Sequence, residues 1–140
     1  MDYQQALDIA FRYLGYRARS VFEVQQKLRE KGADQELESR VISRLKELNY
    51  LDDEQYAKSY LQERAKLSPR AFWLIKSELK KRGISQDIIE QAFSRIDIGE
   101  EQLAQAAYEQ KKRIQKDPDK LRRFLASRGF SYDIIKKIIQ

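Results

Sequence analysis

The chain has 140 residues, with 28 lysines and arginines against 22 aspartates and glutamates, for a formal net charge of +6 at pH 7. It holds no histidine and no cysteine, which excludes imidazole acid–base chemistry, thiolate nucleophiles and disulfides. No Gly-rich phosphate loop, secretory signal or membrane-length apolar run occurs. The composition favours a cytoplasmic protein without enzyme activity or cofactors that binds an anionic partner.

The first third of the chain predicts three helices. An apolar stripe at helical spacing covers residues 2–14, and Gly15 is expected to stop this helix. Ser20 and Glu23 have the spacing of a capping box, so a second helix begins there. It ends at a glycine, and the third helix follows with Asp34 as its cap.

The middle of the chain repeats this order. Asp52 is expected to cap a fourth helix. Ser68 followed by Pro69 predicts the start of a fifth, because proline is favoured at the first helical position. A sixth helix follows Ser85, with Ile88, Ile89, Ala92, Phe93 and Ile96 on its apolar side.

The last part of the chain predicts three further helices. Gly99 breaks the chain, and a seventh helix follows with an apolar stripe that reaches Ile114. Asp117, followed by a proline, caps the eighth. The ninth begins after Ser131, and no stretch alternates like a strand.

One phrase, Leu-x-x-basic-Gly-apolar-Asp/Ser-x-Asp/Glu-Leu/Ile, occurs three times, around Gly32, Gly83 and Gly129. A basic residue suits the negative end of a helix, glycine allows the positive φ that ends it, and Ser or Asp caps the next helix. Such a period is typical of helical arrays. The sequence therefore predicts an all-α fold of nine helices, as an elongated, curved, solenoid-like stack of three tandem three-helix repeats: 1–50, 51–98 and 99–140.

Trp73 is the single tryptophan and has two interpretations. It could be an exposed anchor in a basic patch, or it could pack between repeats. Alignment on the glycines places Phe22 at its position in the first repeat and Asp119 in the third. An aromatic residue that occurs only where another repeat follows favours a joint between repeats.

Asp52, Asp53 and Glu54 form the one dense acidic cluster, which could hold a divalent cation. Carboxylates at three consecutive positions diverge around a helix axis, so a helix cap that also complements the dipole is favoured, and no metal site is predicted.

Basic residues are the candidate partner contacts. The first repeat holds 9 basic and 8 acidic residues, the second 9 and 8, and the third 10 and 6. A cluster of charged residues is most often only a solvated face. Here the helices after the glycines carry acids, so basic and acidic residues lie on different helices, which favours a functional basic face. The candidates are Arg17, Arg19, Arg64, Lys66, Arg70, Lys76, Lys80, Lys81, Arg82, Lys111, Lys112, Arg113, Lys116, Arg122 and Arg123.

Several stretches together resemble the RecX family of regulatory proteins. Arg17-Ala18-Arg19-Ser20 with Glu23 and Leu28 resembles the family's R-x-R-S-x-x-E-L opening, with Val24 where leucine is usual. Residues 50–57 resemble its G-Y-L-D-D-x-x-Y-A junction, although Asn49 replaces the glycine. Residues 75–84 resemble its I-x-x-E-L-x-x-K-G-I block.

The resemblance implies a monomeric modulator of the RecA recombinase, built from three three-helix repeats that lie in the groove of the RecA–DNA filament. Such a protein inhibits RecA ATPase and strand exchange, and so modulates recombinational DNA repair and the SOS response. Two alternatives stay open: a direct binder of single- or double-stranded DNA with helix-turn-helix units, and a helical-repeat adaptor for another acidic protein. A membrane partner is not expected.

Overall fold

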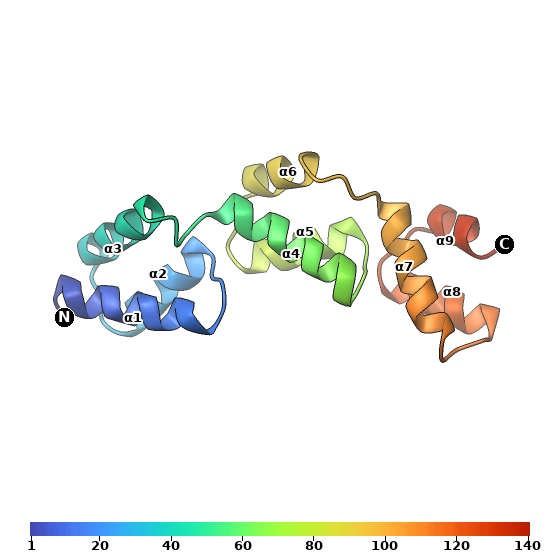
Figure 1. The fold of residues 1–140 in the computed structure, drawn as a ribbon, viewed down its shortest axis with the longest axis horizontal. Coiled ribbons are helices and arrows are strands. Elements are labelled where there is room, and N and C mark those ends of the chain that lie inside the picture. Colours follow the sequence, from blue (N-terminus) through green and yellow to red (C-terminus); the bar gives the residue numbers. More distant parts are fainter. The chain divides into compact units, whose positions relative to one another are not determined.

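The computed structural model describes all 140 residues and contains nine α-helices and no strand (Figure 1). The predicted all-α fold of three-helix repeats is therefore confirmed. The helices are α1 Tyr3–Tyr16, α2 Val21–Glu30, α3 Gln35–Glu47, α4 Asp53–Leu67, α5 Phe72–Lys81, α6 Gln86–Ser94, α7 Glu100–Lys112, α8 Pro118–Ser127 and α9 Tyr132–Ile138. We retain the repeat boundaries after residues 50 and 98 as a proposal.

Most helix ends follow the predicted local chemistry. Ser20 and Glu23 form the capping box of α2, and Pro118 is the first residue of α8. The glycines that end α2, α5 and α8 all have positive φ, as predicted: 101° at Gly32, 82° at Gly83 and 88° at Gly129. Four further predicted caps accept a backbone N–H three residues further on: Asp34, Asp52, Ser85 and Ser131.

Two predicted helix ends are wrong. Gly15 does not stop α1, which continues to Tyr16, because one interior glycine costs a helix only about 1 kcal/mol. Ser68 and Pro69 do not start the fifth helix, which begins at Phe72. The Ser68 hydroxyl accepts hydrogen bonds from arginines instead, and Pro69 is buried in the connection.

The apolar stripes are predicted well, with exceptions at helix ends. Ile114 lies beyond the end of α7 and is 79% exposed. Ile96, predicted on the sixth helix, lies beyond α6, which ends at Ser94, and is half-buried. The turn after α3 places Asn49 at a φ of 63°, a conformation that asparagine tolerates better than most residues other than glycine.

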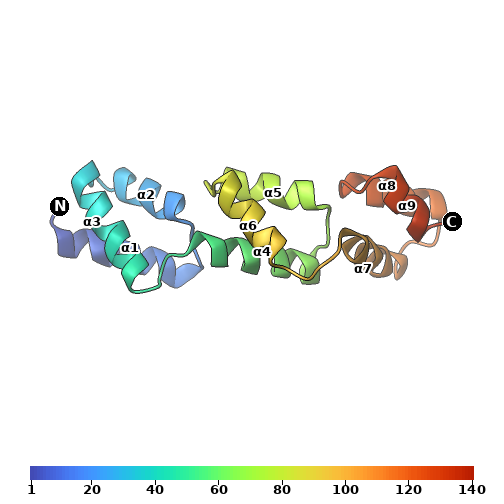
Figure 2. The ribbon, with the colours of Figure 1, turned by 90° about the horizontal axis from the view of Figure 1, so that it is seen from above.

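The chain divides into two compact units, residues 1–57 with 79–93 and residues 58–78 with 94–140. In the first unit, α1, α2 and α3 pack on one another around a core that includes Ala10, Val24, Leu28 and Leu45 (Figure 2). In the second unit, α7, α8 and α9 pack together in the same way. No helix combines the length and apolar character of a membrane span.

Candidate functional site

The start of α2 rests on the glycine turn that follows α5, and these residues form the first joint. The Ser20 hydroxyl donates to the Arg82 carbonyl at 2.6 Å, and the Val21 N–H donates to Asp53 Oδ1 at 3.0 Å. A Cβ on Gly83 would lie 2.2 Å from both Cβ and Cγ of Phe22. No residue with a side chain fits there unless Phe22 moves, so glycine supplies close approach as well as positive φ.

The second joint, between the start of α5 and the turn after α8, uses the same positions. The Ala71 N–H donates to the Arg128 carbonyl at 2.9 Å, and the Phe72 N–H donates to Glu100 Oε1 at 2.9 Å. The Trp73 indole N–H donates to the Gly129 carbonyl at 2.7 Å. A Cβ on that glycine would lie 2.9 Å from the indole nitrogen.

The interpretation of Trp73 as a joint residue is therefore confirmed, although its side chain remains 59% exposed. Sequence reasoning missed the acids of the joints. Asp53 and Glu100 are the first residues of α4 and α7, and Tyr3 holds that position in α1. An acid that occurs only where a repeat precedes it is a signal of the same kind as the aromatic residue.

A polar cluster surrounds the first joint. Arg17 pairs with Glu23 and also donates to the Tyr56 hydroxyl at 3.2 Å. Arg82 donates to the same hydroxyl. Burial acts to raise the pKa of Glu23, but hydrogen bonds from Arg17 and from the Ser20 backbone outweigh it, and this pKa lies below its ordinary value.

The second joint has a cluster of the same composition. Arg70 pairs with Glu78 at 2.7 Å, and the Tyr60 hydroxyl donates to the same carboxylate. Arg128 donates to the Ser68 hydroxyl at 2.7 Å. Burial opposes ionisation of Glu78, but the bonds from Tyr60 and Arg70 lower its pKa. Burial and the neighbouring Arg70 lower the pKa of Arg128.

The acidic cluster at the start of α4 has the structural role that the sequence favoured. Asp52 caps the helix by accepting the Gln55 N–H at 3.1 Å. Asp53 belongs to the first joint, where burial raises the pKa of its carboxyl. No group of three or more metal-ligating side chains lies together anywhere in the chain.

The candidate contact residues fall into two classes. The first class consists of five arginines that bond to other groups of the chain, mostly at the joints. Arg19 donates to the Tyr13 carbonyl and lies 3.8 Å above the Tyr13 ring. Arg64 pairs with Glu63 and lies over Tyr60. The other members of this class are Arg17, Arg70 and Arg82.

The second class lies at the surface. Lys112 extends over the Tyr108 ring, and half-buried Lys111 over Phe124. Arg122 pairs with exposed Asp119. Gln110 donates to the Lys66 carbonyl at 3.4 Å, so the C-terminal ends of α4 and α7 meet within the second unit. Lys76 is half-buried. The remaining exposed members are Lys66, Lys80, Lys81, Arg113, Lys116 and Arg123.

Comparisons with known proteins point to one family. The family model of the first three-helix domain of RecX matches residues 6–45, and that of the second three-helix domain matches residues 52–92. The chain is 35% identical to the regulatory protein RecX of Chlorobaculum tepidum, over 96% of this chain and 86% of that protein. It is 31% identical to that of Prosthecochloris aestuarii, over 99% and 93%.

A crystal structure of RecX from Lactobacillus salivarius has a TM-score of 0.80 and 31% identity, covering 99% of this chain and 94% of that one. The chain spans about half the length of some curated relatives, such as RecX of Leuconostoc citreum, which is 29% identical and of which it covers 53%. Both matched domains have the helices and glycine turns described above. The chain therefore belongs to the RecX family of regulatory proteins.

Proposed function

We propose that this protein regulates the RecA recombinase by binding the RecA–DNA filament, where it lowers ATPase and strand-exchange activity. It acts in the cytoplasm as a monomer, by binding rather than by catalysis, and so modulates recombinational repair and the SOS response. Membership of the RecX family is the observation that carries this proposal.

The distribution of charge supports the choice of contact residues. Arginines at the joints already have partners within the chain, so their charges are partly compensated. Lysines at the ends of α5 and α7, such as Lys80, Lys81 and Lys112, are exposed. A filament presents protein carboxylates and DNA phosphates, and exposed cations can pair with both. We infer that the second class of basic residues, at the surface, forms the main contacts with the filament.

The test is the DNA-dependent ATPase of RecA on single-stranded DNA, with and without the protein. The informative variant reverses charge at Lys111, Lys112 and Arg113, and its matched control preserves charge through Lys111→Arg, Lys112→Arg and Arg113→Lys. We expect the reversed variant to lose inhibition and the control to keep it. The reversed variant will also melt slightly lower, since each cation–π contact contributes about 0.5–1 kcal/mol at exposed sites.

Equal inhibition by both variants at physiological salt would exclude this contact surface. If the parent protein leaves the ATPase and the filament length unchanged, the proposed function itself is wrong, and the adaptor alternative replaces it.

Direct DNA binding is the weaker alternative. In a helix-turn-helix unit the second helix enters the major groove. Two of the three helices that follow the glycine turns, α3 and α6, carry exposed Glu36 and Asp87 in their first turns, which phosphates would repel. We expect naked duplex DNA to bind much more weakly than the RecA filament in a salt titration.

A further inference from the structure

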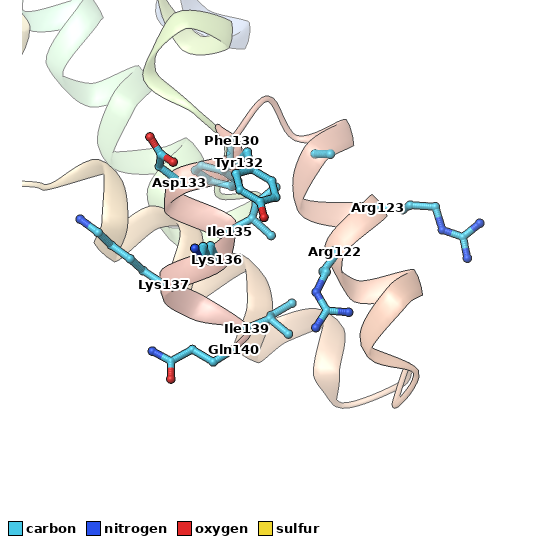
Figure 3. A pocket seen from close by; sticks show the side chains of 11 residues that line it. Arg122, Arg123, Phe130, Tyr132, Asp133, Ile135, Lys136, Lys137, Ile139 and Gln140 are labelled. Atoms are coloured by element: carbon cyan, nitrogen blue, oxygen red, sulfur yellow. The ribbon is translucent and has the colours of Figure 1, made fainter.

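The last repeat contains a hollow of about 1030 Å³ between α8 and α9. Its floor is apolar, with Ala126 on α8, Phe130 in the turn, Ile135 on α9 and Ile139 directly after α9 (Figure 3). Exposed Tyr132 stands at its edge. A hollow of this size exceeds what one side chain fills and is in the range of ligand pockets.

The first repeat fills the equivalent place with its own side chains. Counting from the glycines, Arg29 and Glu38 correspond to Ala126 and Ile135. Arg29 covers Glu38 with two hydrogen bonds, of 2.7 and 2.9 Å, and Glu38 is only 3% exposed. The space between second and third helices therefore accepts a carboxylate when a cation lies above it. In the last repeat, the short alanine side chain leaves this space open.

The rim of the hollow is cationic. Arg122, Arg123, Lys136 and Lys137 line it, against one acid, Asp133. Lys136 has no ion-pair partner, and Arg123 donates only to a backbone carbonyl. Arg122 and Lys137 pair with exposed carboxylates, at Asp119 and Glu101, that an incoming anion can replace.

We propose that this hollow is a docking site for an acidic segment of a partner protein that carries a large apolar side chain. The apolar side chain occupies the floor, and the carboxylates on either side of it meet the rim. A phosphate backbone satisfies the rim but leaves the apolar floor unfilled, which favours a peptide over nucleic acid. The site extends the proposed function but does not depend on it.

The experiment measures fluorescence anisotropy of a labelled octapeptide in which six acidic residues flank a Leu-Phe pair. A second peptide of equal charge has two serines in place of that pair, and a labelled oligothymidine is the third probe. The rim variant combines Arg123→Gln with Lys136→Gln. The closing variant combines Ala126→Arg with Ile135→Glu, which recreates the ion pair of the first repeat without changing net charge.

The control variant combines Arg12→Gln with Lys31→Gln, two exposed cations of the first unit. We expect the Leu-Phe peptide to bind the parent and the control variant equally. It should bind the rim variant and the closing variant at least about tenfold more weakly, a difference of about 1.4 kcal/mol in binding free energy. The serine peptide should also bind the parent at least about tenfold more weakly.

Equal binding of the two peptides would show that the floor is not used and would overturn the proposal. The proposal is also overturned if oligothymidine binds more tightly than the Leu-Phe peptide and if the rim variant and the closing variant both weaken the binding of oligothymidine. If the closing variant does not fold, the rim variant decides alone, because both of its side chains are exposed. Because no recombinase is present, failure here leaves the proposed RecA regulation untouched, and the converse also holds.

Discussion

Alanine substitutions at Gly83 and Gly32 should have very different costs, although both glycines end a helix with positive φ. At Gly32 a Cβ meets nothing within 4 Å, so Gly32→Ala should cost only the left-handed conformation, about 1–2 kcal/mol. At Gly83 the Cβ would lie 2.2 Å from Phe22. Phe22 must move, and overpacking of this kind adds about 1–3 kcal/mol. Gly83→Ala should therefore cost about 2–5 kcal/mol.

Urea unfolding followed by circular dichroism gives both free energies of unfolding. A double-mutant cycle with Phe22→Gly separates strain from clash, because removing the whole side chain, whose Cβ and Cγ both lie 2.2 Å from the added Cβ, leaves only strain at Gly83. In that background, Gly83→Ala should cost about as much as Gly32→Ala does in the parent. The clash is refuted if the two glycine variants are equally stable in the parent, or if Phe22→Gly does not reduce the cost at Gly83.

Three further predictions concern the joints. The pKa of Glu23 is lowered from 4.5 in the folded state. Its pairing with Arg17 therefore stabilises the fold above pH 4.5, and this stabilisation is lost as the pH falls through the folded pKa. Glu23→Gln should flatten the acid limb of a curve of unfolding free energy against pH. The pKa of Asp53 is raised, so its ionised form reduces the stability of the fold at neutral pH. Asp53→Asn keeps an acceptor for the Val21 N–H and should melt at the same temperature as the parent or higher at pH 7. Asp53→Ala loses the acceptor and should melt at a lower temperature. Trp73→Phe removes the indole hydrogen bond of the second joint and should lower the free energy of unfolding in urea by about 0.5–1.5 kcal/mol; an unchanged value would mean that water replaces this bond.

The parts of the fold that were predictable from the sequence depend on local chemistry. Positive φ at the glycines and caps at Ser20, Asp34 and Ser131 involve residues within one turn of each other. The aromatic residues of the joints were also predictable, because comparing repeats at one register reveals which positions change when a neighbouring repeat is absent.

The start of α5 was not predictable, because the partners of its first residues are distant in sequence. Ser68 looks like a cap, but it accepts bonds from Arg70 and from Arg128, which lies 60 residues away. The Phe72 N–H is satisfied by Glu100, 28 residues further on. A distant carboxylate here replaces the local cap, and no local pattern reports that. The same limit applies to the basic candidates, since a charge count does not show which cations have internal partners.

The division of basic residues between joints and surface has a physical reason. A guanidinium is planar and donates in several fixed directions, so Arg17 can bind a carboxylate and a hydroxyl at once. An ammonium group is compact and strongly hydrated, and it is better kept in water. The joints therefore use arginine, and the ends of α5 and α7 expose lysines such as Lys80, Lys81 and Lys112. A surface of hydrated point charges binds by charge more than by geometry, so its affinity should fall steeply with salt while tolerating Lys→Arg changes.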